Sequence, residues 1–365
     1  RWRAAARCPL RMFWKVADVA DSLGLLLLSC VRHQGSYTPL FAAQEGVKIV
    51  AVADEPDIAE WMHAVNQEFA DRYQTPYLRD VEAARARPDV DIVCICSEPT
   101  RHARLAVLAA GAGKQICVDK PMATTVADAE RVVAAVEAGG VTLTYIHRLY
   151  SPAIQKLRAA IDAGAVGLPF ALHMSWVSAG GLTSGAVEDF QLVVDRSLSS
   201  GGELMNFLGY HIDTARYLTG LEVEQVYASA GSYFFEPHRE HGVEDFGLVC
   251  LTLERDVSAT IIAGRSPTKA HAANGDYQLR VHGSQGTLIA DETRPYVTTF
   301  TEPSGRRSQP SFTASQAILE PVIADFLACV RHGRQPLRSI HDGRAQIAAI
   351  EAAYRSIQTS QVERV

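Results

Sequence analysis

The sequence predicts an α/β protein in two parts, a parallel sheet wound with helices and a second α/β region with an open, largely antiparallel mixed sheet. Short apolar runs alternate with amphipathic stretches over residues 23–148, which is typical of βαβ units. Beyond residue 149, β-rich segments follow one another with tight turns between them, which indicates antiparallel pairing. A length of 365 residues also favours two domains over one.

The strands of the first part are expected to be short apolar runs that end at polar turns. We place them at Leu25–Cys30, Val47–Ala53, Asp91–Cys96, Ile116–Val118 and Val141–Ile146. The run before Cys96 is continuously apolar, as in a strand that is buried on both faces. A short helix is expected over 36–45, and Thr125 followed by Asp128 is typical of the start of another.

The second part combines amphipathic helices with strands that alternate apolar and polar residues. Its helices are expected at Ala153–Ala163, Gly202–Leu218, Gln316–His332 and Asp342–Thr359, and its strands include Phe170–Val177, Gly247–Leu253, Ala259–Ala263, Tyr277–His282 and Thr287–Ile289. The turn Gly283–Gly286 joins the last two strands and is short enough for an antiparallel hairpin.

The first residues carry several basic side chains ahead of an apolar run, which superficially resembles a secretion signal. Asp18 and Asp21 directly precede that run, where such a signal carries no acidic residue, and its removal would delete the first strand. We therefore treat 1–22 as an N-terminal extension, 23–148 as the first domain and 149–365 as the second. A cytoplasmic location is expected.

Composition excludes several classes of protein. The hydrophobic content of 47% and the charged content of 21% are those of an ordinary globular protein. A net charge of -6 gives no basic surface, so nucleic acid is not expected as a partner. No apolar run approaches the roughly 18 residues of a membrane span. The 7 cysteines lack CxxC spacing, so neither a disulfide framework nor a metal site is expected.

Lys120 is the leading candidate for catalysis. It follows a short apolar strand, and Pro121 prevents that strand from continuing. Ligands of open α/β sheets bind beyond the carboxyl ends of the strands. A cation held there can polarise a substrate oxygen, although most lysines are simply solvated.

The turn after the first strand is where a dinucleotide fold carries Gly-x-Gly-x-x-Gly. The corresponding residues are Cys30, Arg32 and Gly35, so only the third glycine is present. Arg32 could compensate by binding the pyrophosphate through paired hydrogen bonds.

The end of the second strand supplies another cofactor candidate. Asp54 lies where an acidic side chain accepts hydrogen bonds from ribose hydroxyls, and it would repel a 2′-phosphate, so NAD is favoured over NADP. The same residue could instead cap the next helix. Ser97 and His102, at and beyond the end of the third strand, are expected to line the nicotinamide side.

Three motifs together resemble the glucose-fructose oxidoreductase and inositol dehydrogenase family, Gfo/Idh/MocA. They are Ser97–His102, Asp119–Pro121, and Gly201–Asn206 continuing to Asp213. The resemblance implies an N-terminal Rossmann domain and a C-terminal α/β domain whose open mixed sheet makes oligomer contacts. It also implies NAD(P)-dependent oxidation of a sugar, polyol or cyclitol by a homodimer or homotetramer.

The family's second motif, Gly-Gly-x-x-x-(Asp/Asn)-x-Gly-x-His-x-x-Asp, is imperfect here. Aligned on Asn206 and Asp213, its histidine position holds Tyr210, and His211 follows. A regular helix places Tyr210 opposite the apolar stripe and His211 beside that stripe, which favours Tyr210 as the residue facing the cofactor. A one-residue bulge near Gly209 would reverse this choice.

The resemblance implies a mechanism. Tyr210 or His211 would take the proton of a substrate hydroxyl while Lys120 holds the oxygen and lowers the pKa of the tyrosine; Asn206 would orient them. Substrate contacts are expected from segments that border the cleft in the family. The candidates are Arg148, Trp176, Asp195 and Asp213, with Arg265 and Lys269 as further possibilities.

Two other functions are compatible with the sequence. The altered glycine turn and the missing motif histidine are compatible with a catalytically silent relative that binds NAD and a sugar to regulate another protein. The other is an NAD-requiring glycosidase, which oxidises and then re-reduces its substrate.

Overall fold

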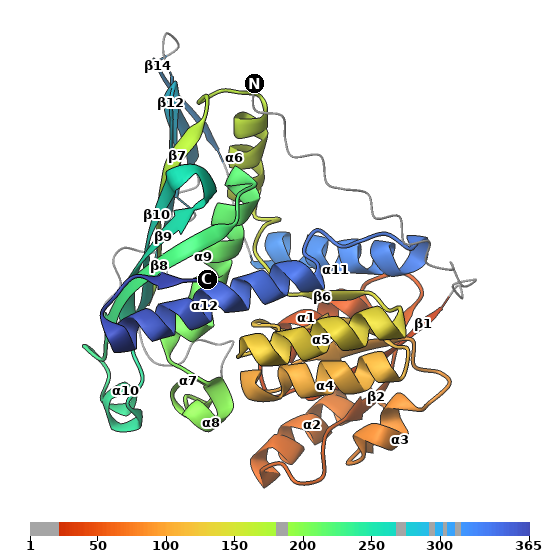
Figure 1. Ribbon diagram of the computed structural model, residues 1–365. Coiled ribbons are helices and arrows are strands. Elements are labelled where there is room, and N and C mark those ends of the chain that lie inside the picture. Colours follow the sequence, from red (N-terminus) through yellow and green to blue (C-terminus); the bar gives the residue numbers. More distant parts are fainter. Residues whose placement is uncertain (1–21, 180–188, 268–274, 292–295, 302–304, 311–314) are drawn as a thin grey trace.

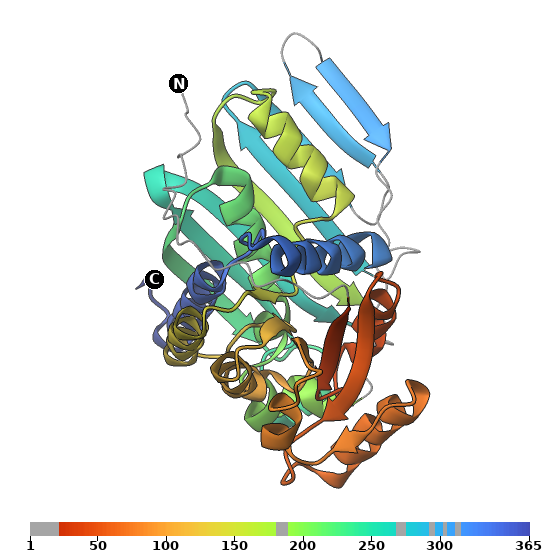
Figure 2. The same cartoon turned by 90° about the vertical axis from the view of Figure 1, so that its right-hand side faces the viewer.

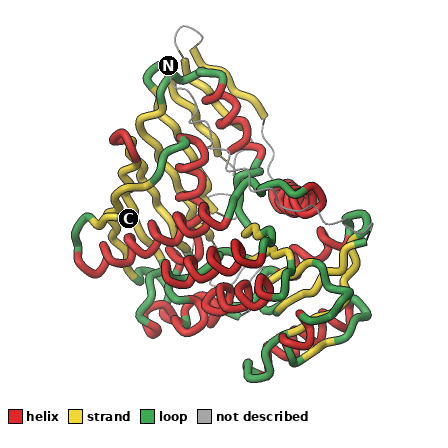
Figure 3. Tube along the Cα trace, turned by 45° about the vertical axis from the view of Figure 1, so that its right-hand side comes forward, coloured by secondary structure: helices red, strands yellow, loops and turns green. Residues whose placement is uncertain are grey.

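The computed structural model describes residues 22–179, 189–267, 275–291, 296–301, 305–310 and 315–365. It contains two sheets that lie in different parts of the molecule, with helices between them (Figure 1, Figure 3). This arrangement confirms the predicted fold class.

The first sheet is parallel throughout, in the order β3-β2-β1-β4-β5-β6. Its strands are β1 (Leu23–Leu28), β2 (Val47–Ala53), β3 (Tyr77–Leu78), β4 (Ile92–Ile95), β5 (Gln115–Val118) and β6 (Leu143–Tyr145). The helices are α1 (Gln34–Ala42), α2 (Glu60–Arg72), α3 (Val81–Arg85), α4 (Pro99–Gly111) and α5 (Val126–Gly139). The Thr125 side chain caps α5 by accepting a hydrogen bond from the Asp128 amide, as expected.

Strand β1 begins and ends two residues earlier than the sequence indicated. It ends because Ser29 adopts a left-handed backbone, with a φ of 64°, which stops an extended strand. Within the strand, Gly24 is required because a Cβ atom would lie 1.7 Å from the Asp89 carbonyl oxygen. The shift changes which residues occupy the following turn.

The second sheet is mixed, in the order β14-β13-β12-β11-β7-β10-β9-β8-β15. Only β7 and β10 pair in parallel among these described strands. The strands are β7 (Pro169–Ala179), β8 (Val223–Gly231), β9 (Phe246–Leu253), β10 (Val257–Ser266), β11 (Gly275–Gly283), β12 (Gly286–Asp291), β13 (Tyr296–Thr301), β14 (Gly305–Pro310) and β15 (Glu363–Arg364).

Helices pack on one face of this sheet. They include α6 (Pro152–Asp162), which lies across the strands in Figure 2, α9 (Glu203–Thr219) and α12 (Ile340–Thr359). The remaining helices are α7 (Gln191–Val194), α8 (Arg196–Ser199), α10 (Glu236–His241) and α11 (Ser315–His332). In the part of the chain described, no helix combines the length and the apolar composition that a membrane crossing needs.

Candidate active site

Lys120 lies in the turn that follows β5, at the carboxyl edge of the parallel sheet, as expected. It is only 7% exposed. Its side-chain nitrogen donates hydrogen bonds to the main-chain oxygen of Asn206, at 2.9 Å, and to the Asn206 side-chain oxygen. Burial, and then the charge of Arg32, lower the pKa of Lys120 to about 7. Near neutral pH this amine can therefore also accept a proton.

Asp119 fixes the turn that carries the lysine. Its carboxylate accepts hydrogen bonds from the Tyr37 hydroxyl, at 2.7 Å, and from the Lys120 amide, at 2.8 Å, and lies 2.6 Å from His33 Nδ1. Burial opposes the charged form, but His33 and Arg32 outweigh it and hold the pKa of Asp119 well below its usual range. Helix α1 therefore positions the lysine through this buried carboxylate.

Helix α9, which carries the second motif, begins at a pair of glycines. A Cβ atom on Gly202 would lie 2.0 Å from the Glu244 carbonyl oxygen, and one on Gly201 would lie 2.2 Å from the Tyr354 hydroxyl. The Glu244 carboxylate accepts hydrogen bonds from the amides of Gly202 and Leu204. The glycines thus let a buried carboxylate cap the helix that approaches Lys120.

A buried ion pair adjoins the lysine and includes Arg265. The Arg265 guanidinium donates to Glu203 at 2.6 Å, and Glu203 in turn accepts a hydrogen bond from Asn206 at 3.0 Å. Burial alone would raise the pKa of Glu203, but His238 and Arg265 lower it to about 2. Arg265, considered from the sequence as a further substrate contact, therefore supports Asn206 through Glu203.

Tyr210 lies beside the lysine. The Lys120 nitrogen is 5.4 Å from the centroid of the Tyr210 ring. The predicted lowering of the Tyr210 pKa is wrong, because burial, and then the charge of Asp119, raise that pKa.

His211 takes a different position. Helix α9 is continuous through Gly209, so the bulge that would have favoured His211 does not form. His211 is 5% exposed, and its Nδ1 atom lies 3.2 Å from the Phe207 carbonyl oxygen one turn earlier. Its ring also lies edge-on to Trp176, with centroids 6.4 Å apart.

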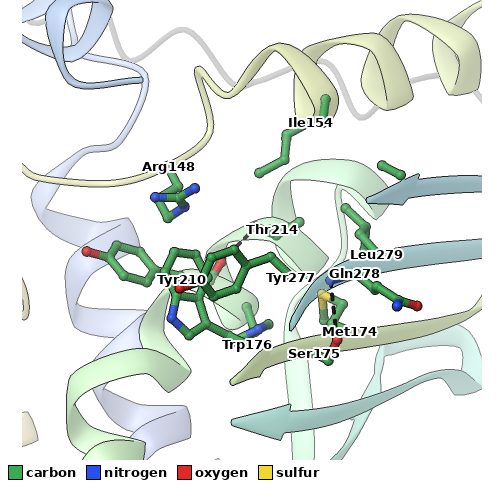
Figure 4. A pocket seen from close by; sticks show the side chains of 13 residues that line it. Arg148, Ile154, Met174, Ser175, Trp176, Tyr210, Thr214, Tyr277, Gln278 and Leu279 are labelled. Atoms are coloured by element: carbon green, nitrogen blue, oxygen red, sulfur yellow. Dashed lines mark hydrogen bonds between the residues drawn. The ribbon is translucent and has the colours of Figure 1, made fainter. Parts of the chain in front are cut away.

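A cavity of about 440 Å³ opens beside Tyr210 (Figure 4). Two of the predicted substrate residues line it: Arg148 stacks on the Trp176 indole, with its Cζ atom 4.2 Å from the ring centroid. The other lining residues are Ala153, Ile154, Met174, Ser175, His211, Thr214, Tyr277, Gln278, Leu279 and Ala290.

Two other predicted substrate residues lie elsewhere. Asp213 is 1% exposed and accepts hydrogen bonds from Tyr145, at 3.0 Å, and from Gln346, at 2.7 Å, because its side of α9 packs on β6 and α12. Asp195 caps α8 by accepting a hydrogen bond from the Ser197 amide at 2.8 Å. Their placement in the substrate site was wrong. Lys269 lies outside the described residues.

The turn after β1 differs from the predicted alignment. Cys30 is 2% exposed and packs in the core, where burial raises the pKa of its thiol. Gly35 is exposed in the first turn of α1, and a Cβ atom there would meet no close neighbour. Neither residue has the role of a motif glycine. The residue that the sequence analysis missed is Ser29, whose left-handed backbone is the signal a glycine would normally give.

Asp54 follows β2 and is fully buried. Its carboxylate accepts hydrogen bonds from Arg101, at 2.6 Å, and from Asn66, at 2.9 Å. Arg101 also pairs with Glu55, at 3.0 Å, and with Glu98. An acidic cluster thus stands at the predicted ribose position, and Arg101 already occupies part of it.

Ser97 and His102 are buried beneath the turns instead of lining a cavity. The Ser97 hydroxyl donates to the Glu98 carbonyl at 3.0 Å. The two ring nitrogens of His102 lie 2.7 Å and 2.9 Å from the carbonyl oxygens of Pro121 and Ser97. His102 therefore ties the end of β4 to the lysine turn, and its predicted position facing the nicotinamide was wrong.

A second, smaller cavity of about 210 Å³ lies between the two domains. It is lined by Arg32, Pro99, Pro121, Leu192, Val193, Ser199, Gly202, Met205 and Asn206. Leu192 and Val193 of α7 are nearly fully buried and belong to an apolar cluster with Val31 and Met62 of the first domain. Helix α7 thus fills much of the space above the β1 turn.

Two buried polar atoms in that turn, Ser29 Oγ and Arg32 Nε, have no hydrogen-bond partner among the described residues. Such groups are costly to bury unless a ligand satisfies them. A hydroxyl and a guanidinium suit a diphosphate, and parallel-sheet domains bind that group at this turn. The residues present therefore fit a dinucleotide.

Comparison with known proteins identifies both halves of the chain. Residues 34–147 match the sequence model of the oxidoreductase family with an NAD-binding Rossmann fold, and residues 154–289 match the GFO/IDH/MocA C-terminal domain.

Individual relatives cover most of the chain. D-Apiose dehydrogenase from Paraburkholderia graminis is 30% identical over 350 residues, 90% of this chain and 86% of that protein. Inositol 2-dehydrogenase from Rhizobium meliloti is 28% identical over 339 residues, 91% of this chain and 96% of that protein. The crystal structure of an oxidoreductase domain protein from Kribbella flavida has the same fold, with a TM-score of 0.82, 19% identity, and coverage of 95% of this chain and all (100%) of that one. The chain therefore belongs to the Gfo/Idh/MocA family of oxidoreductases.

Proposed function

We propose that this protein is an NAD-dependent oxidoreductase that transfers a hydride between nicotinamide and a hydroxyl-bearing carbon of a sugar, polyol or cyclitol. The observation that carries the proposal is the meeting of Lys120, from the first sheet, with Asn206 and Tyr210, from α9. The names of the relatives, D-apiose dehydrogenase and inositol 2-dehydrogenase, support the substrate class.

We assign the proton acceptor to Lys120 and the hydrogen-bond donor to Tyr210, because burial lowers the pKa of the first and raises that of the second. In the oxidative direction the neutral Lys120 amine, with a pKa of about 7, accepts the proton of the substrate hydroxyl. The protonated Tyr210 hydroxyl holds the same oxygen by a hydrogen bond. Bound NAD supplies the acceptor for the hydride that leaves the carbon. The C–H and O–H bonds break together, and the carbon becomes a carbonyl.

The Lys120 ammonium that results is held by groups already in place. The main-chain and side-chain oxygens of Asn206 accept its hydrogen bonds, and the negative charge of Glu203 lies behind Asn206. Asn206 and Glu203 are thus positioning residues, which stabilise the charge that proton transfer creates.

The cofactor is bound in our proposal by the β1 turn and the end of β2. Ser29 and Arg32 hold the diphosphate, and Asp54 shares its oxygens between Arg101 and a ribose hydroxyl. The carboxylates of Asp54, Glu55 and Glu98 disfavour a 2′-phosphate, so NAD is preferred over NADP. Because α7 fills the groove, cofactor binding requires α7 and α8 to move outward.

The test is a spectrophotometric screen of the purified protein with NAD and a panel of sugars, polyols and cyclitols, with Lys120→Met as the paired variant. We expect NADH formation that the variant lacks, while titration shows that the variant still binds NAD. Equal turnover by both proteins would remove Lys120 from the mechanism. NAD binding without turnover of any panel member would favour a regulatory relative.

We also propose that the protein forms a homodimer or homotetramer in the cytoplasm, without nucleic acid or membrane partners. The face of the second sheet opposite its helices exposes Tyr227, Leu248 and Ile262 to 38%, 41% and 40%, and Leu248 pairs directly with Ile262 across β9 and β10. Contiguous apolar side chains of this kind mark interaction surfaces. Light scattering would test the assembly, and Leu248→Glu should yield monomers.

A further inference from the structure

We infer that the substrate carries an apolar group, as in an alkyl or aryl glycoside, next to the hydroxyl that is oxidised. The inference rests on the proposed function only for the position of that hydroxyl, beside Tyr210. It derives from the 440 Å³ cavity, whose two ends differ in chemistry (Figure 4).

The end of the cavity away from Lys120 is apolar. Its walls are Ala153 and Ile154 of α6, Met174 of β7, Leu279 of β11 and Ala290 of β12. Figure 4 shows Ile154, Met174 and Leu279 on the side away from Arg148 and Tyr210. An apolar group that reaches this end gains about 25 cal/mol for each Å² removed from water.

The polar residues that border this end direct their hydrogen bonds at the protein. The Thr214 hydroxyl donates to the Tyr210 carbonyl at 2.7 Å. The Ser175 hydroxyl and the Gln278 amide both donate to Asp276, at 2.9 Å and 3.0 Å. A free sugar would therefore place hydroxyl groups against apolar walls with few replacements for their bonds to water, which is unfavourable for each such group.

The other end suits a sugar ring. Trp176 packs against Tyr277, with ring centroids 4.3 Å apart and the rings tilted by 38°, and Arg148 covers the indole. The buried Trp176 Nε1 atom has no hydrogen-bond partner among the described residues and can donate to a ring or glycosidic oxygen. Aromatic faces pack on the C–H face of a ring, so the reactive hydroxyl lies toward Tyr210 and the substituent toward Leu279.

The experiment compares methyl and phenyl glycosides of the same sugar, over a series of common pyranosides. Binding to the full-length protein is measured by calorimetry with and without NAD, and turnover by NADH formation. For the sugars that bind, we expect the phenyl member to bind at least tenfold more tightly than the methyl member. Equal affinities throughout the series would overturn the inference.

Variants locate the effect. Ala153→Leu fills the apolar end, and we expect the phenyl-to-methyl affinity ratio to fall about tenfold. Ala159→Leu, on the exposed side of the same helix, is the matched control and should leave the ratio unchanged. If Ala153→Leu unfolds, Ile154→Ala provides the second test, because it removes apolar contact and should lower the ratio severalfold. A ratio unaffected in the folded variants would also overturn the inference.

The outcomes separate this inference from the proposed function. A phenyl preference in calorimetry without NADH formation from any glycoside would support the inference and count against the dehydrogenase. NADH formation from unsubstituted polyols, with no phenyl preference, would support the dehydrogenase and overturn the inference.

Discussion

The two cavities that border helix α9 share this helix as a wall and differ in almost every other respect. The smaller one lies beside Arg32 and Asn206, where buried polar atoms have no partner, whereas the larger one is lined mainly by aromatic and aliphatic side chains. Helix α9 contributes Asn206 to the first and Tyr210, one turn later, to the second. In our proposal, one turn of α9 thus separates the residue that holds Lys120 from the residue that contacts the substrate.

Loss of Lys120 should have the largest effect. We expect Lys120→Met to lower kcat about a thousandfold, because the substitution removes the group that accepts the substrate's proton. NAD affinity, measured by titration, should change little. Lys48→Met, an exposed substitution on β2, is the control and should retain full turnover. Comparable losses in both variants would indicate damage to the fold instead of to the chemistry.

Tyr210→Phe tests the residue that helix α9 contributes to the larger cavity. We expect kcat to fall about a hundredfold, because the hydroxyl that holds the substrate oxygen is lost while the ring still lines the larger cavity. Steady-state kinetics should show a much smaller effect of His211→Gln. The opposite order would make His211 the residue that contacts the reacting oxygen.

The buried Lys120 amine should also make the free energy of unfolding depend on pH. Because the pKa of Lys120 is about 7 in the folded protein and 10.5 is its ordinary value, the unfolded chain binds more protons between those pH values. The free energy of unfolding should therefore rise by about 2 kcal/mol from pH 7 to pH 9 through this group. Urea denaturation should show the rise in the wild type but not in Lys120→Met; parallel curves would contradict the low pKa.

Arg32→Ala should have the smallest effect, and that effect should be confined to the smaller cavity. We expect NAD to bind about tenfold more weakly, because a charge-assisted bond to the diphosphate is lost. Affinity for the glycosides in the larger cavity should not change. Arg131→Ala, at an exposed position on α5, serves as the control. Unaltered NAD affinity in Arg32→Ala would place the diphosphate elsewhere.

Several strands and long helices were predictable from hydrophobic periodicity, because runs such as Val47–Ala53 and the stripe along α9 repeat over several turns or pleats. Short elements such as α7 and β3 were not, since two to four residues carry little periodic signal. The end of β1 was misplaced because a left-handed serine replaces the glycine that normally marks it.

Among the site residues, some of those identified by motif lie where the sequence indicated. Lys120, Asn206 and Tyr210 lie together, and Arg148 and Trp176 share a cavity. Asp195 and Asp213, which the resemblance placed in the substrate site, instead cap α8 and bond to Tyr145 and Gln346, respectively. Sequence does not reveal such partners, because Gln346 lies far along the chain from Asp213 and meets it only in the fold.

Helix α12 has a consequence for motion. It is bonded to α5 through Arg344 with Glu130, at 2.9 Å, and to α9 through Gln346 with the Gly209 carbonyl, at 3.0 Å. The Arg344 bond crosses from one domain to the other, so a hinge rotation between them would have to break it, whereas the Gln346 bond lies within the second domain. That bond joins two exposed side chains and contributes roughly 0.2–1 kcal/mol, so by itself it opposes such a rotation only weakly.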